Sequence, residues 1–581
     1  MSDIATTTMS VPPGNYRWRT WVPNRGAALI WVQLAGVCLM VLPPFAYLIK
    51  SSLIVSPVGS PHTIGFGNYA RVLDLAGFDV WAATFAFAAG SSLVAVLLGA
   101  STAWLVARTN VPFRQVTLVG ALLSLGAPLI VKGIGWILLL GPNNGLLNIW
   151  LRALLGGAGT PIELFSLGGM IFVEGLLWGP VAFLLTLPAL AAIDPTLEEA
   201  AGTCGARRWR TFWQVTLPLV RPSILAVLLL SFIRALESFE VPLLIGIPGG
   251  VLTVTTALYQ SVHAGFIPRY GEASAYAVLL LAAASPPLLM YYRATRESAK
   301  FATVSGKGYR TTQIDLGRWK YPCALWVAIL PISLAAPLLI MLWASFLPLY
   351  ADPSLNDLAR LTLDNYRSMW TREEVTASIY NSLSVGVGSA AVVTVGSLVM
   401  SWTVVRRREP FRWALDAIAS MPLVFPGIVL GIAILVEFLD LQVIPIYGTI
   451  FILIFAFSVK FLPYGMRFCH PAILSINRDL EDSASMCGAR NLVVLYRIVV
   501  PLASPAIMAA SIYVFMYAIR DLSVAILLSG PSNSIVSIVI LDLWNNGEIP
   551  ELAAFSVLVA TGATVLGVAF MRLTVKHRFT A

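Results

Sequence analysis

Charged side chains inside long apolar stretches are the residues of this sequence best placed to do chemistry. The segment SFIRALESFEVP, residues 231–242, contains Arg234, Glu237 and Glu240. On a helix, their spacing of three residues places these side chains on one stripe. A charge in such apolar surroundings is costly, so it marks a functional site by default.

A second charged pair lies in the apolar segment VFMYAIRDLSVA, residues 514–525, which contains Arg520 and Asp521. When the two segments are aligned, Arg520 lies opposite Glu237. One interpretation is that each arginine forms a structural ion pair with a neighbouring acid. The other is that these side chains form a gate or a weak solute contact in a pathway. The acids suit a cationic solute, whereas Arg520 weakens that inference.

Histidine and cysteine are scattered through the chain and form no cluster typical of catalysis or metal binding. The sequence has four histidines and five cysteines, and no two cysteines have the CxxC spacing. It also has no G-x-x-x-x-G-K-[ST] phosphate loop. We therefore expect no enzyme active site, no metal and no cofactor in this chain.

A polar, basic segment interrupts the apolar sequence at residues 198–222, EEAAGTCGARRWRTFWQVTLPLVRP. Just before it, Asp194 followed by Pro195 is a typical helix start. Gly205 allows a sharp turn, because glycine adopts positive φ freely. We expect a second helical segment to end at Pro218. The whole segment is predicted to be a helix–turn–helix elbow at the edge of the apolar region.

The same segment recurs at residues 481–505 as EDSASMCGARNLVVLYRIVVPLASP, and Gly488 lies 283 residues after Gly205. One copy could be an interfacial helix that simply ends a hairpin. Two copies at corresponding places favour a docking surface used twice by a two-fold partner. Other pairs at this offset are Pro180 with Pro463, Pro188 with Pro471, Glu198 with Glu481, Pro218 with Pro501 and Pro222 with Pro505.

Composition indicates an integral membrane protein. Of 581 residues, 58% are hydrophobic and 12% are charged, which is about half the charge of a typical soluble domain. The net charge of +9 indicates basic cytoplasmic loops rather than nucleic-acid binding. Twelve apolar runs are long enough to cross a lipid bilayer. They are 28–49, 80–107, 115–140, 166–193, 219–247, 274–294, 322–347, 378–405, 413–438, 447–470, 502–529 and 552–573.

The predicted spans form two halves with the same internal order. VPFRQ at 111–115 matches EPFRW at 409–413, and GNYAR at 67–71 resembles DNYRS at 364–368. Six spans in each half give both halves the same orientation, which makes this a parallel duplication. The predicted fold class is an all-α integral membrane protein with two tandem six-helix halves. Its units are an N-terminal tail (1–27), a first half (28–294), a linker (295–321) and a second half (322–581).

The distribution of lysine and arginine predicts the orientation. Basic residues precede the first span, fill the linker and follow the last span, and Arg108 and Arg406 lie in short loops on the same side. The tail, the linker, both elbows and both termini are therefore expected to be cytoplasmic. Three further charges in the spans are expected to be packing partners or to extend to the membrane surface: Lys132, Glu174 and Lys460.

The two elbow segments resemble the EAA motif of ABC-importer permeases. That motif has an acid with two small residues, then a glycine, then a branched apolar residue shortly before a proline. The first copy is Glu199-Ala200-Ala201, Gly205, Val215 and Leu217-Pro218, and the second is Asp482-Ser483-Ala484, Gly488, Ile498 and Val500-Pro501. The second copy departs by Asp for Glu, Ser for Ala and Val for Leu. The resemblance covers nearly all of both halves and is greatest to fused double permeases of the type I importer fold, in the ferric-iron group.

This resemblance implies a permease subunit in a bacterial inner membrane. A cytoplasmic ABC ATPase homodimer, which binds ATP and Mg, would receive the elbows as coupling helices, and an extracytoplasmic solute-binding protein would deliver the solute. Ferric iron is the expected solute, and related permeases handle polyamines, thiamine and aminoethylphosphonate. The expected coupling residues are Glu199, Ala200, Gly205, Ala206, Arg207, Asp482, Gly488, Ala489 and Arg490. The expected pathway or gate residues are Arg234, Glu237, Glu240, Arg520 and Asp521.

The alternative hypothesis is a secondary active transporter with two parallel six-helix halves and no ATPase. The elbows lie between the fourth and fifth spans of each half, and the short loop RTNVPFRQ at 108–115 lacks a Gly-Asp-Arg signature. Both features favour the ATP-driven class. An intramembrane enzyme would need clustered histidine, cysteine or paired acids at the membrane face, and the scattered histidines speak against it.

Overall fold

The computed structural model is almost wholly helical, which confirms the predicted all-α class. Its described residues contain two isolated β-bridges and no longer strand. They comprise 25–55, 63–124, 126–157, 161–298, 314–350, 355–407, 411–441 and 446–578. Most of the predicted N-terminal tail and of the predicted linker lies outside these ranges.

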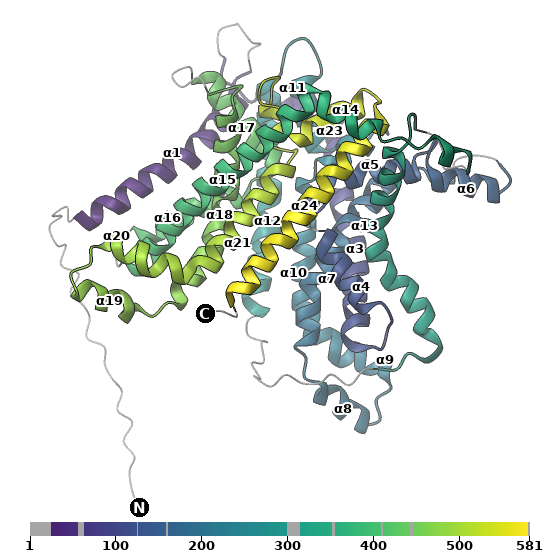
Figure 1. The fold of residues 1–581 in the computed structure, drawn as a ribbon, viewed down its shortest axis with the longest axis horizontal. Coiled ribbons are helices and arrows are strands. Elements are labelled where there is room, and N and C mark those ends of the chain that lie inside the picture. The colour runs from purple at the N-terminus through teal and green to yellow at the C-terminus, as the bar shows by residue number, and fades with distance from the viewer. Residues whose placement is uncertain are drawn as a thin grey trace, which may run out of the picture.

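The first half contains helices α1 to α12 and the second half α13 to α24 (Figure 1). The first-half helices are α1 (Arg25–Leu53), α2 (Gly67–Val72), α3 (Leu75–Arg108), α4 (Arg114–Ser124), α5 (Leu129–Leu140), α6 (Leu146–Leu154), α7 (Leu167–Ala191), α8 (Pro195–Thr203), α9 (Arg208–Thr211), α10 (Leu217–Glu237), α11 (Val254–His263) and α12 (Tyr270–Ser298). The second-half helices are α13 (Lys320–Ser345), α14 (Asp364–Thr371), α15 (Glu373–Arg406), α16 (Arg412–Ser420), α17 (Gly427–Asp440), α18 (Ile450–Ser475), α19 (Arg478–Met486), α20 (Asn491–Val494), α21 (Val500–Arg520), α22 (Ala525–Leu528), α23 (Val536–Asn545) and α24 (Ile549–Arg578).

Ten helices in the described part of the chain are long and apolar enough to cross a membrane, or twelve spans if each of two bent pairs counts as one. The bent pairs are α4–α5, which turns by 116°, and α16–α17, which turns by 108°. One continuous helix was expected in each place. Pro128 and Pro426 stand at the two breaks, where a proline cannot donate the backbone hydrogen bond of a helix. Nearly every residue of α5 and α17 is buried, so each bend carries the chain into the core.

The fifth and eleventh spans lie earlier in the chain than predicted. They occupy 209–237 and 491–520, whereas the apolar runs suggested 219–247 and 502–529. The expectation that Pro218 ends a helical segment is therefore wrong. Each elbow continues into its span as one long helix, and the apolar residues beyond the span form shorter segments.

A wide helical turn explains how each span tolerates its proline. One π-helical turn precedes the proline in both halves, at Phe212–Thr216 and Leu495–Val499. In the first, the Leu217 N–H donates to the Phe212 carbonyl, five residues back. The wider turn relieves the clash between the Pro218 ring and the carbonyl four residues earlier, which would break a regular helix.

Both halves repeat the same three-dimensional plan, as the parallel duplication predicts. In Figure 1 the elbow helices of both halves, α8 and α19, lie at the lower end of the molecule. Helix α3 packs along α7, and α15 packs along α18. Asn68 donates to two carbonyls around the end of α1, at 2.7 and 3.0 Å. Asn365 donates to two carbonyls around the end of α13, at 2.7 and 2.9 Å, which explains the GNYAR and DNYRS match.

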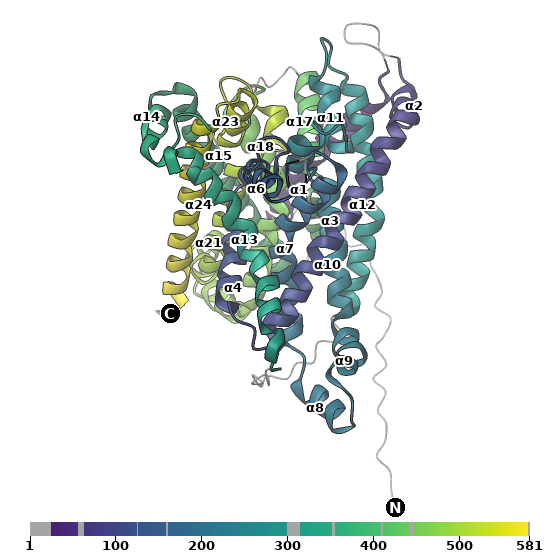
Figure 2. The ribbon, with the colours of Figure 1, turned by 90° about the vertical axis from the view of Figure 1, so that its right-hand side faces the viewer.

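The halves exchange their first helices. Helix α1 packs on α16 and α17 of the second half, and α13 packs on α4 and α5 of the first (Figures 1 and 2). Phe45 stacks on Phe425 with ring centroids 3.6 Å apart. Gly135 lies against Pro337, where an added Cβ would come within 2.5 Å of the proline ring. The exchange makes each half part of the other's core.

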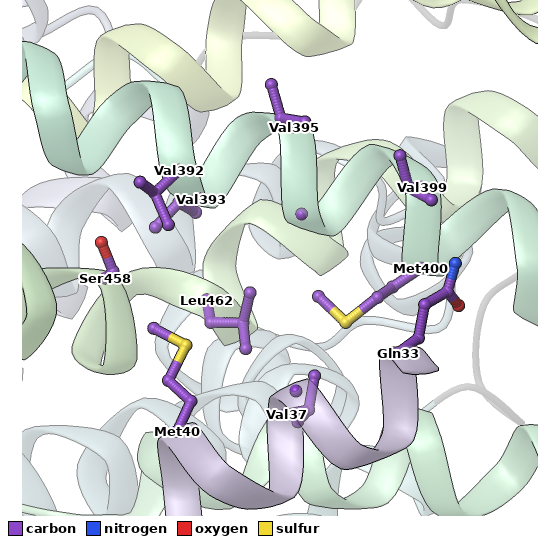
Figure 3. Close-up of a pocket in the computed structure, with 12 residues that line it drawn as sticks. Gln33, Val37, Met40, Val392, Val393, Val395, Val399, Met400, Ser458 and Leu462 are labelled. Carbon is purple, nitrogen blue, oxygen red and sulfur yellow. The ribbon is translucent and has the colours of Figure 1, made fainter. Parts of the chain in front are cut away.

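An apolar cavity of about 240 Å³ lies where α1 meets α15 and α18 (Figure 3). Met40, Met400 and a row of valines line it, and Gln33 and Ser458 are its polar side chains. Such a lining suits hydrocarbon rather than a charged solute. The cavity contains none of the charged side chains near the ends of α10 and α21.

Candidate functional site: two elbows and a charged cluster between the halves

The first elbow is a short helix, α8, followed by a glycine turn. The Asp194 carboxylate accepts a hydrogen bond from the Thr196 N–H at 2.9 Å and caps the helix, as predicted. Gly205 has a φ of +82°. The Gly205 N–H donates to the Gly202 carbonyl, and the Ala206 N–H donates to the Ala201 carbonyl. This pair of bonds is the Schellman motif, which requires positive φ after the last helical residue.

The second elbow repeats this geometry bond for bond. The Asn477 side chain accepts from the Asp479 N–H at 3.1 Å. Gly488 has a φ of +84°, and its N–H and the next one close the same two bonds onto the end of α19. The predicted glycine turn is therefore confirmed in both copies.

The predicted coupling residues lie on the exposed side of each elbow. Helix α8 projects beyond the rest of the first half (Figure 2). Ala206 and Ala489 are half-buried under the turns, and the other members are exposed: Glu199, Ala200, Gly205 and Arg207 in the first elbow, and Asp482, Gly488 and Arg490 in the second. The two elbows thus present matching surfaces at the same end of the molecule, which is the geometry that a two-fold partner requires.

The first-half part of the charged cluster lies at the end of α10. The Arg234 Nη1 atom lies 3.2 Å from the Glu237 Oε2 atom, so this predicted pair is confirmed. Arg234 Nη2 also donates to the Tyr464 hydroxyl at 2.7 Å, and Tyr464 belongs to α18 of the second half. Glu240 lies beyond the end of α10, after two non-helical residues, so the predicted stripe on one helix holds only for Arg234 and Glu237.

The second-half part of the cluster lies at the end of α21. Asp521 forms an ion pair with Lys460 of α18, a partner other than the neighbouring arginine that the sequence suggested. The second oxygen of Asp521 accepts from the Val524 N–H at 3.0 Å. The Arg520 guanidinium lies 3.9 Å from the centroid of the Tyr517 ring, which is a cation–π contact.

Like Lys460, two further charges that were expected to be packing partners or to extend to the membrane surface belong to this cluster. Lys132 of α5 is 3% exposed and donates to the Ser124 carbonyl at 3.1 Å. Glu174 of α7 is 3% exposed and accepts from the Trp178 indole N–H at 3.0 Å. Lys132 interacts electrostatically with Arg520 and Glu174. The signal for both was their charge in an apolar span, and only the fold shows which charged residues lie near them.

Electrostatic interactions join the cluster across the halves. Glu237 interacts with Lys460, and Glu240 interacts with Lys460 and Asp521. The cluster contains four acids and four bases: Glu174, Glu237, Glu240 and Asp521 with Lys132, Arg234, Lys460 and Arg520. Among the described residues, no three histidine, cysteine, aspartate or glutamate side chains are close enough to hold a metal ion.

Stacked tyrosines form the second-half wall beside these charges. The Tyr464 and Tyr513 rings are 5.1 Å apart, and the Tyr513 and Tyr517 rings are 4.4 Å apart. Each pair is close to parallel, at 30° and 29°. Because Arg234 donates to Tyr464 of the other half, a polar contact joins the two halves beside the tyrosine stack.

The sequence matches a family described as "Binding-protein-dependent transport system inner membrane component" over residues 95–294 and again over 392–577. The two matched regions lie one in each half and include both elbows. They together cover more than half of the chain.

Similar proteins include two ferric transport permeases. The chain is 26% identical to the ferric transport system permease protein FbpB of Actinobacillus pleuropneumoniae over 74% of this chain and 61% of that protein. It is 26% identical to the putative ferric transport system permease protein FbpB 1 of Haemophilus influenzae over 70% of this chain and 63% of that protein. The chain therefore spans about three-fifths of the length of these relatives.

Shorter regions are similar to other permeases. One region is 31% identical to the trehalose/maltose transport system permease protein MalF of Thermococcus litoralis, over 37% of this chain and 74% of that protein. Among solved structures, a bacterial ABC transporter that imports alginate matches 47% of this chain and 94% of its own, with 21% identity and a TM-score of 0.37.

Proposed function

The chain belongs to the family of binding-protein-dependent transport system inner membrane components, and from this premise we propose that it is the permease of an ATP-driven importer. Its two halves enclose one solute path, and its two elbows receive motion from a separate ATPase. The observation that carries the proposal is the pair of equivalent, exposed elbows at one end of the molecule.

The elbows suit a rigid partner surface for a physical reason. Each one ends in a hydrogen-bonded glycine turn, so its exposed residues hold fixed positions rather than those of a flexible loop. Arg207 and Arg490 follow the turns and can reach partner carboxylates with a planar guanidinium group. Coupling is assigned to Glu199, Ala200, Gly205, Ala206 and Arg207 and, in the second half, to Asp482, Gly488, Ala489 and Arg490.

The ATPase is a separate cytoplasmic homodimer, which binds ATP and Mg, and the chain itself carries out no bond chemistry. Two similar elbows favour two identical ATPase subunits. The elbow end then faces the cytosol together with both termini, in accordance with the basic residues of the tail and linker. The solute-binding protein docks at the opposite end, where α11, α14 and α23 lie (Figure 1).

The solute path runs between α10 and α21, through the charged cluster. The contact of Arg234 with Tyr464 closes the path, and the cluster opens when the ATPase moves the halves apart. Arg234, Glu237, Glu240, Arg520 and Asp521 line or gate this path. The cluster has as many acids as bases, so it makes the path polar but does not form a strong binding site for one charge. A solute can therefore leave the path as readily as it enters.

Ferric iron is the proposed solute. Two of the relatives are ferric transport permeases by name, which supports this proposal. Polyamines, thiamine and aminoethylphosphonate are the solutes to compare with it, since the resembled group also handles them.

Transport by purified components tests the proposal. The chain, the ATPase that co-purifies with it and a binding protein loaded with radioactive ferric iron are reconstituted in proteoliposomes, with or without ATP. We expect iron uptake only with ATP, and no competition by spermidine, thiamine or aminoethylphosphonate. If one of these compounds competes with iron for uptake, that compound would become the proposed solute in place of iron. Uptake driven by an ion gradient without an ATPase would instead identify a secondary transporter.

A further inference from the structure

A buried arginine ties the first elbow to the end of α3. Arg108 is the last residue of α3 and is only 1% exposed, whereas the sequence indicated only a basic loop residue that sets orientation. Its Nη2 atom donates to the Ile193 carbonyl, just before the elbow, at 3.0 Å. Its Nη1 atom lies 3.8 Å from the Glu198 carboxylate in the first turn of α8.

The second half contains an equivalent arrangement, in which the arginine and the acid are closer and hydrogen-bonded. Arg406 is the last residue of α15, and its Nε atom donates to the Glu481 carboxylate of α19 at 2.6 Å. Its Nη2 atom donates to the Ile473 and Ile476 carbonyls, just before the elbow, at 3.0 and 2.7 Å. The side chains of this pair are 12% and 8% exposed. A guanidinium fork with two kinds of acceptor fixes distance and angle together.

The two pairs are equivalent by sequence as well as by geometry. Arg406 lies 298 residues after Arg108, which is the offset of VPFRQ and EPFRW. Glu481 lies 283 residues after Glu198, which is the offset of the elbows. The two members of each pair therefore come from separately aligned segments, and the fold brings them together twice.

We propose that Arg108 and Arg406 are positioning residues that clamp the elbows. Arg108 holds the first elbow to α3, and Arg406 holds the second elbow to α15. These helices then transmit the motion of the elbows to the proposed solute path. The proposal rests on the proposed function, because it concerns how the coupling elbows act. An elbow that shifts must move the end of α3 or α15 with it or break a buried ion pair, and the second is costly. The clamp thus converts movement of the elbow into movement of a long helix.

The next contacts connect these helices to the cluster. Helix α3 packs against α7 and α10, which carry Glu174, Arg234 and Glu237. Helix α15 packs against α18 and α21, and Thr394 of α15 lies within hydrogen-bond distance of Ser511 of α21, at 2.9 Å. Each clamp is therefore one packed helix away from the charged residues of the same half.

The test compares Arg108→Met and Arg406→Met with Arg114→Met and Arg412→Met. The last two residues lie six positions after the clamp arginines and are themselves equivalent in the repeat, so they are matched controls. Each variant is purified with its ATPase in nanodiscs. ATP hydrolysis is measured alone and with binding protein loaded with ferric iron, and the ratio of the two rates is the readout.

The clamp variants are expected to assemble with the ATPase and to keep its basal rate, because the exposed elbow surface is unchanged. Stimulation by the loaded binding protein is expected to fall at least about fivefold, the size of a typical coupling between distant sites. The controls are expected to keep wild-type stimulation.

Unchanged stimulation in both clamp variants would overturn the clamp while leaving the proposed function intact. Failure of the wild-type chain to bind any ATPase would overturn both proposals and is a different result. If methionine variants yield little folded chain, Glu198→Gln and Glu481→Gln keep the shape and remove the charge. Wild-type stimulation in those variants, at normal thermal stability, would equally overturn the clamp.

Discussion

The elbows and the charged cluster differ in how far they preserve the internal repeat. At the elbows, Gly205 and Gly488 share the same positive φ and the same pair of hydrogen bonds. At the charged cluster, equivalent positions carry unlike residues: Arg234 corresponds to Tyr517, and Glu237 corresponds to Arg520. A two-fold partner requires two equal surfaces, whereas one solute between two halves does not. The repeat is preserved at the elbows, where the proposed two-fold ATPase would dock, and it is not preserved at the cluster.

The difference extends to the neighbouring helices. Lys460, which pairs with Asp521, corresponds to Leu177, and Tyr464 corresponds to Val181. The first half therefore contributes most of the acids, and the second half contributes the tyrosine stack. The two sides of the cluster therefore differ in chemistry, with three of the four carboxylates on one side and the aromatic rings on the other, which symmetric halves could not provide.

The largest expected effect comes from a substitution in the charged cluster, where the two halves differ. Lys460→Met leaves the Asp521 carboxylate buried without its ion-pair partner, which costs about 3–5 kcal/mol of folding stability. Leu177→Met, at the equivalent position of the first half, is the control and should cost less than about 1.5 kcal/mol. Thermal unfolding of the purified chain in detergent measures both.

Restoring neutrality tests the cause. Lys460→Met combined with Asp521→Asn removes both charges, and Asn can still accept the bond from the Val524 N–H. This double variant should recover most of the lost stability. If it is as unstable as Lys460→Met alone, packing rather than charge explains the loss.

A smaller effect concerns the contact that crosses the halves. Tyr464→Phe removes the hydroxyl that accepts from Arg234, and a hydrogen bond to a charged group contributes about 1.5–3 kcal/mol. The closed arrangement should lose that stabilisation, so ATP hydrolysis without binding protein should rise about tenfold or more. Tyr380→Phe, at a 69% exposed tyrosine, is the control. An unchanged basal rate would remove this contact from the gate.

The smallest expected effect tests a contact that is the same in both halves. Asn68→Ala and Asn365→Ala each remove two hydrogen bonds to carbonyls at the end of the first helix of a half, at a cost of about 1–3 kcal/mol. Because the geometry is the same in both halves, the two variants should lower the unfolding temperature by equal amounts. A clear difference would mean that the halves are held at this end by different contacts.

Much of the fold was predictable because its signals are local. The apolar runs, the prolines and the offset of 283 residues specify the spans, the elbows and the parallel duplication. The bends at Pro128 and Pro426 were not predicted, because an apolar run has the same composition whether its helix is straight or broken. The early start of the fifth span was missed for a similar reason: a π-helical turn before Pro218 leaves no mark in hydrophobicity.

The same distinction applies to the candidate site: its local features were predictable from the sequence, and its long-range contacts were not. The glycine turns follow from φ preference and were predicted residue by residue. The partners of Asp521, Lys132 and Glu174 depend on which helices meet, and a sequence with charges in several spans allows many pairings. Arg108 was used only as a basic loop residue that indicates orientation, because only the fold reveals that α3 ends beneath an elbow.

The most direct test of the account is ATP hydrolysis by the chain and its co-purified ATPase when one elbow at a time is damaged. Gly205→Val and Gly488→Val force a branched residue into positive φ, at about 1–2 kcal/mol each, and Gly202→Ala, where an added Cβ meets nothing within 4 Å, is the control. We predict that either valine variant abolishes stimulation by the iron-loaded binding protein, to the same extent in both halves, while the control keeps it. Full stimulation in both valine variants would contradict the coupling role of the elbows.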